Sequence, residues 1–290
     1  MSAILEVRGL TVRFGSLIAV NGVGFDAQRG SITAVIGPNG AGKSSLFNLI
    51  SGAIRPSAGS VRFDGADLTG ARPDRMLAAG LARSFQITNL FFELPVRENL
   101  RLAAQFVEGG RGLLRGVAYS RAALARVDEL IERFALQDKA DELAGFLSHG
   151  EQRRLEIAVA LAARPRMLLH DEPTQGMSHA DTHDTETLIR GLAAEGLSIL
   201  LVEHDVELVM NLSDHVVVMH QGQKLAEGPP QQVRSDPLVQ SAYFGEANPA
   251  GSHVGEATPS DSRVGEATPS DTRVGEATPA LSSVGDSNHA

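Results

Sequence analysis

Short, largely apolar runs alternate with polar connections along the first 245 residues. Runs at 31–36, 167–170, 198–202 and 215–220 are long enough for buried strands and too short for buried helices. Shorter runs at 4–8, 10–14, 59–65, 81–85 and 223–227 also predict strands, because Gly residues or Asp-Gly pairs border them. A helical pattern at about 178–194 lies between two of the strands, so the order of elements predicts an α/β fold.

The pattern changes in the middle of the chain. From Val96 to about Ala144 apolar residues recur at helical spacing, for example from Leu124 to Phe134. This spacing predicts a helical insertion at about 87–147. Directly after it, Ser148 and Glu151 stand three residues apart ahead of an apolar stretch. That arrangement predicts a capping box that opens a helix ending near residue 164.

The last 45 residues follow a different pattern. Near-copies of Val-Gly-Glu-Ala-Thr-Pro-Ser-Asp place a glycine every ten residues from Gly245 to Gly285. Each copy has few residues for a core and includes a strand breaker, so the segment is predicted to be a disordered tail. The sequence therefore predicts one folded domain at 1–245 and a tail at 246–290, either a flexible extension or a segment that binds a partner.

Composition narrows the function classes. The net charge is −9, of which the tail carries −5, and the remaining −4 gives no support for nucleic acid as a partner, because that binding relies on clustered cations. The absence of cysteine excludes disulfides and thiolate metal sites and fits a reducing compartment. Glu6 and Arg8 interrupt the start of the chain, so no signal peptide is predicted, and the apolar runs are too short for a membrane span.

The strongest chemical signal is the segment from Gly37 to Ser44, which follows the predicted strand 31–36 and precedes a predicted helix at 45–50. Its letters fit G-x-x-x-x-G-K-S, the pattern of a phosphate-binding loop. Glycines allow a tight turn with inward N–H groups, and the following helix begins with its positive dipole end at the same place. Lys43 is expected to reach the β and γ phosphates, and the Ser44 hydroxyl is a natural ligand for Mg²⁺.

Acidic and titratable side chains follow two other strands. Asp171 and Glu172 come directly after 167–170, and His204 comes after 198–202. Because parallel strands present their carboxyl ends at one edge, these residues are expected beside the phosphate loop. Asp171 suits Mg²⁺, and Glu172 suits a base that accepts a proton from an attacking water. The structural alternatives are a loop or N-cap pair for the acids and an ordinary buried or surface histidine for His204.

Phe14 has two interpretations. An aromatic ring upstream of a phosphate loop is able to stack on an adenine face. A phenylalanine near a strand end is also a common core residue, and the residues alone leave both readings open.

The order of these motifs resembles the ATP-binding cassette (ABC) ATPases over residues 1 to about 245. The resemblance depends on the phosphate loop, Gln86, Leu147-Ser148-His149-Gly150-Glu151-Gln152, Leu168-Leu169-His170-Asp171-Glu172-Pro173 and His204. It implies a P-loop NTPase with a mostly parallel sheet, an N-terminal antiparallel β subdomain and a helical insertion.

The resemblance also implies the roles of individual residues. ATP and Mg²⁺ become the cofactors, Phe14 becomes the adenine-stacking ring, and Gln86 becomes a ligand that links the metal and the attacking water to the transport partner. Glu172 becomes the catalytic base and His204 the γ-phosphate switch. The residues expected to bind nucleotide are Phe14, Gly37, Pro38, Asn39, Gly40, Ala41, Gly42, Lys43, Ser44, Ser45, Ser148 and Gly150, and those expected to bind metal are Ser44, Gln86 and Asp171. Ser148 and Gly150 belong to the signature motif, which in this family binds ATP held by the opposite subunit.

Three positions depart from the usual family pattern. The signature is L-S-H-G-E rather than L-S-G-G-Q, His170 stands where an aliphatic residue is usual, and Gln175-Gly176-Met177-Ser178 replaces S-A-L-D. With Ala226-Glu227-Gly228-Pro229-Pro230, these features resemble the group that takes up branched-chain amino acids and urea. Lipopolysaccharide-export ATPases share much of the same framework.

The resemblance implies a subunit at the cytoplasmic face of the inner membrane. Its expected partners are separate permease subunits, a second ABC ATPase subunit (the same chain or a sibling) and, indirectly, a solute-binding protein. A soluble ABC ATPase without a transporter and a poorly hydrolysing regulatory subunit remain alternatives.

Overall fold

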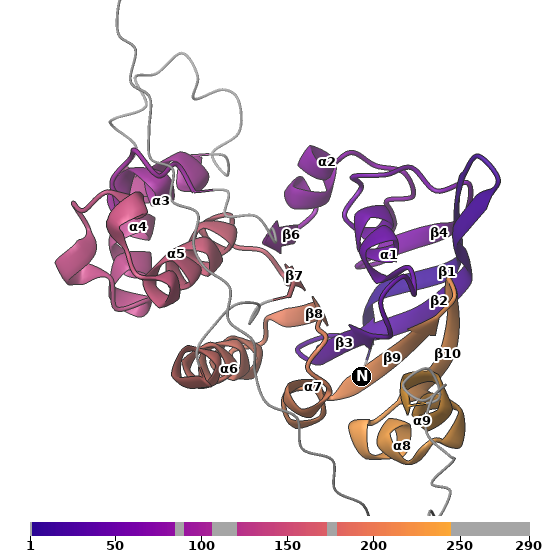
Figure 1. Cartoon of the computed structure of the whole chain (residues 1–290). Coiled ribbons are helices and arrows are strands. Elements are labelled where there is room, and N and C mark those ends of the chain that lie inside the picture. The colour runs from indigo at the N-terminus through magenta and orange to yellow at the C-terminus, as the bar shows by residue number, and fades with distance from the viewer. Residues whose placement is uncertain (1, 85–89, 106–120, 173–178, 245–290) are drawn as a thin grey trace, which may run out of the picture. The chain divides into compact units, whose positions relative to one another are not determined.

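The computed structural model describes residues 2–84, 90–105, 121–172 and 179–244. Two sheets organise this part of the chain (Figure 1). Gln86 and the tail at 246–290 lie outside the described residues. No helix of the described part is long and apolar enough to span a bilayer.

The N-terminal sheet is antiparallel and has the order β2-β1-β4-β5. Its strands are β1 (Ala3–Phe14), β2 (Leu17–Gln28), β4 (Ala58–Phe63) and β5 (Ala66–Asp67). The two short strands predicted at 4–8 and 10–14 are one long strand whose pairing with β2 shifts register between Val7 and Leu10. Gly9 adopts φ +56° there, which lets the strand continue through the irregularity. The sequence reasoning missed β2.

The main sheet has the order β10-β9-β3-β8-β7-β6, and only the β9–β10 pair is antiparallel among its described pairings. Its strands are β3 (Ile32–Ile36), β6 (Leu81–Ser84), β7 (Met167–Asp171), β8 (Ser198–Val202), β9 (His215–His220) and β10 (Gln223–Gly228). The predicted mostly parallel sheet and N-terminal antiparallel subdomain are therefore confirmed.

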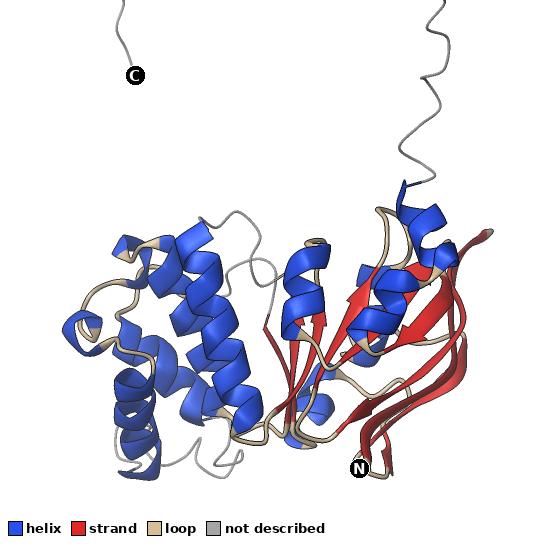
Figure 2. Ribbon diagram, turned by 90° about the horizontal axis from the view of Figure 1, so that it is seen from below, coloured by secondary structure: helices blue, strands red, loops and turns tan. Residues whose placement is uncertain are grey.

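Helices lie on and beside the main sheet (Figure 2). They are α1 (Lys43–Ile50), α2 (Pro73–Ala78), α3 (Val96–Gln105), α4 (Arg121–Arg133), α5 (His149–Ala162), α6 (His179–Ala194), α7 (Val206–Leu212), α8 (Pro230–Ser235) and α9 (Pro237–Phe244). Helices α3 and α4 pack on each other and on α5, which confirms a helical insertion in the described part of 87–147. Two 3₁₀ turns, Gln137–Lys139 and Ala144–Phe146, connect α4 to α5.

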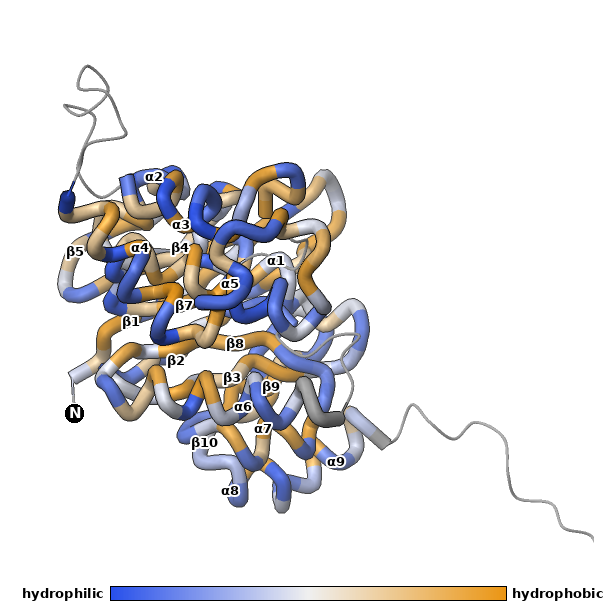
Figure 3. The backbone as a smooth tube through the Cα atoms, turned by 90° about the vertical axis from the view of Figure 1, so that its left-hand side faces the viewer, coloured by the Kyte–Doolittle hydropathy of each residue, from blue (hydrophilic) through white to orange (hydrophobic). Residues whose placement is uncertain are grey.

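The main sheet separates two apolar cores. Ile32, Ala34 and Ile36 of β3 face a core shared with helices α3 to α7, whereas Val35 faces a core shared with α1 and the N-terminal sheet. A strand buried on both faces must be apolar throughout, which is why these strands appear as continuous apolar runs in the sequence. Figure 3 shows them as hydrophobic segments through the middle of the fold.

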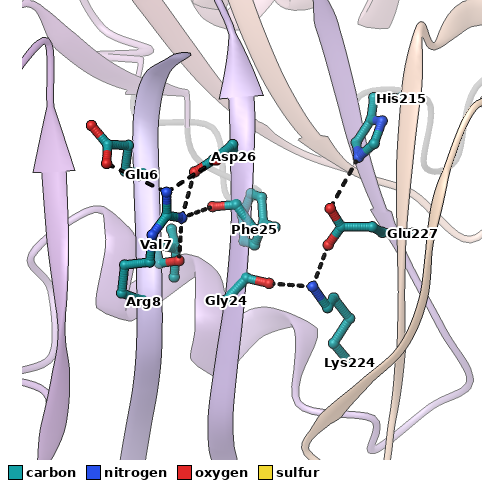
Figure 4. Close-up of polar contacts among 9 residues, drawn as sticks. All are labelled: Glu6, Val7, Arg8, Gly24, Phe25, Asp26, His215, Lys224 and Glu227. Atoms are coloured by element: carbon teal, nitrogen blue, oxygen red, sulfur yellow. Dashed lines mark hydrogen bonds and ion pairs between the residues drawn. The ribbon is translucent and has the colours of Figure 1, made fainter.

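A polar connection joins the two sheets (Figure 4). Lys224 on β10 donates from Nζ to the carbonyl of Gly24 on β2 and pairs with Glu227, whose other oxygen lies 3.7 Å from Nε2 of His215. Arg8 on β1 pairs with Asp26 on β2 within the N-terminal sheet. The bond from Lys224 holds β10 beside that sheet, and the β9–β10 turn lies close to residues 19–22, where the N–H of Asn21 donates to the carbonyl of Gly222.

Candidate functional site

The loop from Gly37 to Ser44 connects β3 to α1 with almost no spare room. A Cβ at Gly37 would lie 2.2 Å from the carbonyl oxygen of Met219, and one at Gly42 would lie 2.4 Å from that of Ala19. Gly42 also has φ +95°, a conformation that strongly favours glycine. The loop is therefore pressed against two neighbouring backbones and can follow this path only with glycine at both positions.

Helix α1 begins at the loop with free N-terminal N–H groups in place of a side-chain cap. Its N-cap, Gly42, has no side chain that could accept from the first helical N–H groups, so these groups and the helix dipole suit an anion. Ser44 is exposed and Ser45 is half-buried in the first turn. Among the remaining loop residues, Asn39 and Gly40 are exposed, Pro38 is half-buried, and Ala41 is buried with its carbonyl bonded to the N–H of Gly222.

Lys43 bends back over the loop. Its Nζ donates to the carbonyl of Gly37 at 2.6 Å and to that of Pro38 at 3.0 Å. Burial lowers the pKa of Lys43, and the charges of Glu172 and Asp171 oppose that shift. The ammonium thus lies between the loop and the two acids, and its bonds to two carbonyl oxygens can be exchanged for phosphate oxygens.

Asp171 ends β7 and is almost fully buried. Its Oδ2 accepts from Nη2 of Arg83 at 3.0 Å, and its Oδ1 has no hydrogen-bond partner among the described residues. Burial raises the pKa of the carboxyl, although the guanidinium of Arg83 counteracts the shift. A buried carboxylate oxygen without a donor suits a hard cation, and the Asp171 carboxylate and the Ser44 hydroxyl are both the oxygen ligands that Mg²⁺ prefers.

Arg83 on β6 connects this acid to the helix after the loop. Its Nη1 donates to Oδ1 of Asn48 at 2.7 Å and to Oγ of Ser51 at 2.8 Å, and its guanidinium lies 5.3 Å from the centre of the Phe47 ring. The sequence reasoning missed Arg83. A lone cation inside an apolar strand was the available signal.

His170 lies on the strand just before Asp171. It is fully buried, and its Nδ1 contacts the hydroxyl of Ser84 on the neighbouring strand β6. Burial lowers the pKa of His170 well below its ordinary value, so the side chain is neutral. A neutral ring with a hydroxyl partner is compatible with a core position that is aliphatic in the usual family pattern.

Glu172 turns out of the strand in a left-handed conformation, with φ +49°. Its Oε1 contacts Nε2 of His204, and its backbone N–H donates to the carbonyl of Val202 at 2.9 Å. The Glu172 side chain is only 8% exposed and that of His204 is 44% exposed, so the imidazole lies between the buried acid and solvent. Lys43, Asp171, Glu172 and His204 therefore come together, as the positions of the strand ends predicted.

Arg153 reaches the same place from α5. Its Nη2 donates to the carbonyl of Glu172 at 3.1 Å, and its Nη1 pairs with Glu156 at 2.7 Å. The sequence reasoning missed this residue, because a cation in an amphipathic helix gives no local sign of a buried partner. Tyr243 on α9 was also missed: burial raises the pKa of its phenol, and the backbone of Gly37 opposes that shift.

Ser148 and Gly150 lie apart from this group in the described contacts. Ser148 is the N-cap of α5; its hydroxyl accepts from the N–H of Glu151 at 3.3 Å, and the Glu151 carboxylate accepts from the N–H of Ser148 at 2.8 Å. The predicted capping box is confirmed. Gly150 is half-buried in the first turn of α5, and the hydrogen bonds of the described residues include none from either residue to the phosphate loop.

Phe14 is 48% exposed at the end of β1 and pairs with Leu17 across the hairpin. A ring with half its surface in solvent is not an ordinary core residue. Gln86 lies in a segment outside the described residues, so its position beside the metal ligands stays a prediction.

Comparison with known families places these features in context. Residues 20–175 match the family described as "ABC transporter", which is more than half of the chain. Residues 223–248, which include β10, α8 and α9, match the family described as "Branched-chain amino acid ATP-binding cassette transporter".

Three similar curated proteins are described as branched-chain amino acid transport ATP-binding proteins. The high-affinity branched-chain amino acid transport ATP-binding protein BraF of Pseudomonas aeruginosa is 42% identical over 252 residues, which are 84% of this chain and 98% of BraF. The corresponding protein LivG of Escherichia coli is 40% identical over 251 residues, with the same two shares. A probable LivG of Methanocaldococcus jannaschii is 34% identical over 254 residues, again 84% of this chain and 98% of the relative.

Solved structures agree in fold. A nucleotide-free ATP-binding cassette from an ABC transporter superposes with a TM-score of 0.75 at 31% identity and covers 83% of this chain and 99% of its own. The ADP conformation of an ATP-binding cassette of an ABC transporter gives the same TM-score at 32% identity and covers 84% of this chain and all of its own.

Proposed function

Since the chain belongs to the ABC transporter family as an ATP-binding, ATP-hydrolysing subunit, we propose that it powers the uptake of branched-chain amino acids or of a related small polar solute such as urea. The match of residues 223–248 to a branched-chain amino acid family carries this proposal. The names of the BraF and LivG relatives support the same cargo class.

The geometry supports a division of roles at the nucleotide site. Lys43, the loop N–H groups and the start of α1 hold the phosphates, and Phe14 offers an exposed ring for the adenine. Glu172 accepts a proton from the attacking water, and the contact with Nε2 of His204 orients its carboxylate. His204 is exposed enough to reach the terminal phosphate.

Ser44 and Asp171 would hold Mg²⁺, with Gln86 as a third ligand. The metal would neutralise charge on the phosphate oxygens when bound. Arg83 occupies one oxygen of Asp171 and leaves the other for the cation.

Two such subunits would share their nucleotides. Ser148 and Gly150 start a helix whose N-terminal dipole suits an anion, and they lie away from the chain's own loop in the described contacts. A site that is complete only with the signature of a second copy, or of a sibling subunit, explains this separation.

The permease subunit would dock in an apolar cleft of about 370 Å³ between α2, β6, α3 and α5. Leu77, Leu102 and Val159 line it, and Leu102 keeps 38% of its surface exposed. Arg83 lines the same cleft and bonds Asp171, so a partner segment in the cleft would touch the residue that holds the metal ligand. This arrangement would place the subunit at the cytoplasmic face of the membrane and couple it indirectly to a solute-binding protein.

The cargo is tested in vesicles that contain this subunit, its permease and its solute-binding protein. We expect ATP-dependent uptake of radiolabelled leucine, competed by isoleucine and valine. Uptake of urea but not of leucine would identify urea as the transported solute. Uptake of neither solute would contradict the proposal.

The nucleotide site is tested with two variants of the purified subunit. Glu172→Gln should retain ATP affinity, accumulate a dimer and hydrolyse about 10²- to 10⁴-fold more slowly, because the base is lost while the phosphate contacts remain. Lys43→Ala should weaken ATP binding itself. Wild-type hydrolysis in Glu172→Gln would remove that residue from the role of base, and unchanged ATP affinity in Lys43→Ala would exclude the loop assignment.

The cleft is tested with Leu102→Glu, which places a charge at its mouth. This variant should bind ATP normally and lose copurification with the permease. Leu238→Glu, which changes a 62% exposed leucine on α9, is the matched control. An intact permease complex in Leu102→Glu would place the partner elsewhere.

A further inference from the structure

A basic pocket lies at the edge of the main sheet opposite the phosphate loop. It has a volume of about 300 Å³ and lies among the segments that precede β3, β7 and β8 and the facing side of α4. Five arginines and one acid are its charged lining residues: Arg29, Arg126, Arg133, Arg164, Arg166 and Glu195. The nucleotide loop follows the other end of β3, so this pocket is separate from the site described above.

The arginines of the pocket outnumber the acidic residues that pair with them. Arg133 pairs with Glu195 inside the pocket, while Arg29 and Arg166 share Asp64 and Arg126 pairs with Glu129. Three acids therefore face five arginines. A chain with a net charge of −9 gathers positive charge here, and each guanidinium has five N–H donors, of which one ion pair uses only part.

Arg164 differs from the other arginines of the pocket in its backbone conformation and its hydrogen bonding. It follows the end of α5 in a left-handed conformation, with φ +48°, at the position where helices usually end with glycine. Its side chain makes no hydrogen bond with any described residue, and its nearest acidic oxygen, on Glu129, is 3.9 Å away. The Arg164 side chain is 69% exposed, so its guanidinium is open to a ligand, and the left-handed backbone that presents it is not explained by fold stability.

Two other arginines are held in place before any ligand arrives. Arg126 is 10% exposed, and its Nη2 donates to the carbonyl of Leu161 at 2.7 Å. Arg133 lies two turns further along α4 and is fixed by Glu195. Because their side chains are already ordered, little conformational entropy is lost when they bind an anion.

We propose that this pocket binds a small phosphoryl anion with two or more negative charges. Planar guanidinium groups match phosphate oxygens with paired hydrogen bonds, and a compact phosphate group satisfies several arginines at once. The bound anion connects α4 of the helical insertion to the loops before β7 and β8. Its source is either a free phosphate compound or the headgroup of an anionic lipid.

The test uses the full chain with saturating ADP and no added divalent metal, so that the phosphate loop is occupied. Titration calorimetry with inorganic pyrophosphate should then detect one further site. Arg164→Gly should weaken this affinity about tenfold and leave the melting temperature unchanged or higher, because glycine removes the backbone strain. Arg133→Gln should weaken it to a similar extent.

Controls separate this site from general charge effects and from the nucleotide site. Arg72→Gln and Arg234→Gln remove exposed arginines outside the pocket and should leave pyrophosphate affinity unchanged. Lys43→Ala should impair ADP binding at the phosphate loop but not pyrophosphate binding in the pocket. The pocket assignment is overturned if Arg164→Gly binds pyrophosphate normally, if Arg72→Gln loses as much affinity, or if neither pyrophosphate nor vesicles containing phosphatidic acid, whose headgroup is a phosphate monoester, bind. Vesicle binding that Arg164→Gly abolishes, without pyrophosphate binding, supports the site with a lipid as its source.

Discussion

Arg153 provides a direct test of how Glu172, the proposed catalytic base, is held. Its guanidinium comes from α5, is 10% exposed, and donates to the backbone carbonyl of Glu172 while pairing with Glu156. Glu172 has an unfavourable left-handed backbone, so an outside contact that fixes its carbonyl also fixes the direction of its side chain. We expect Arg153 to act as a positioning residue for Glu172.

The size of the effect follows from the two bonds. Loss of a hydrogen bond to a buried carbonyl costs about 1–3 kcal/mol. Removal of one partner from a fully buried ion pair costs about 3–5 kcal/mol, and this pair is slightly exposed, so Arg153→Gln should destabilise the fold by about 3 kcal/mol. A misplacement of Glu172 by about 1 Å should also lower kcat about 10²-fold. Arg153→Lys keeps the charge, so both its stability and its kcat should fall less than those of Arg153→Gln.

Stability is measured by urea unfolding, and kcat and KM for ATP are measured well below the melting temperature. Glu156→Gln removes the ion pair but keeps the bond to Glu172, so it should lower stability without lowering kcat. Arg154→Gln on the same helix is the charge-matched control. A normal kcat in folded Arg153→Gln would limit Arg153 to a structural role, and unchanged stability would refute the assigned hydrogen bonds.

Three further predictions follow from single contacts. Gly42→Ala should lower the free energy of unfolding by at least about 2 kcal/mol and abolish nucleotide binding, because the added Cβ meets the Ala19 carbonyl. Gly40→Ala adds its Cβ in open space and should lower the free energy of unfolding by about 1 kcal/mol. Urea unfolding and ADP titration compare the two variants. The Ser148 N–H lowers the pKa of Glu151, so its stabilisation is present above the unfolded-state pKa of about 4.3 and is lost as the pH falls. Glu151→Gln should therefore cost about 0.5–1 kcal/mol at pH 7 and less near pH 4, and an equal cost at both pH values would contradict the assignment. Tyr243→Phe should lower the free energy of unfolding by about 1 kcal/mol in the same assay if the phenol oxygen accepts from the backbone of Gly37, and no change would exclude that interaction.

Periodicity could predict the main sheet because its strands are buried on both faces and appear as continuous apolar runs. It could not predict β2 in the same way, since Asn21, Gly22 and Gly24 interrupt the strand. Those polar and flexible residues are accommodated by register shifts against β1, which only the paired structure reveals. Helices α8 and α9 were also missed, because six or eight residues are too few to establish a helical period.

Some residues of the candidate site could likewise be predicted from the sequence, and others could not. The order of parallel strands could predict that Lys43, Asp171, Glu172 and His204 meet, because each follows a strand end. The residues that hold these side chains in place could not be predicted. Arg83 lies 88 residues before Asp171, and no local pattern in the chain links the two.

Adjacent carboxylates at the end of β7 acquire different chemical surroundings from a single backbone change. In a continuous strand, successive side chains point to opposite faces of the sheet. Asp171 is still within β7 and meets Arg83 of the neighbouring strand, whereas Glu172 leaves the strand with φ +49° and meets His204 instead. The first acid keeps one buried oxygen for a cation, and the second keeps a partly solvent-facing imidazole beside it. The turn at Glu172 therefore separates the proposed metal ligand from the proposed base, which gives a reason for an unfavourable conformation at that residue.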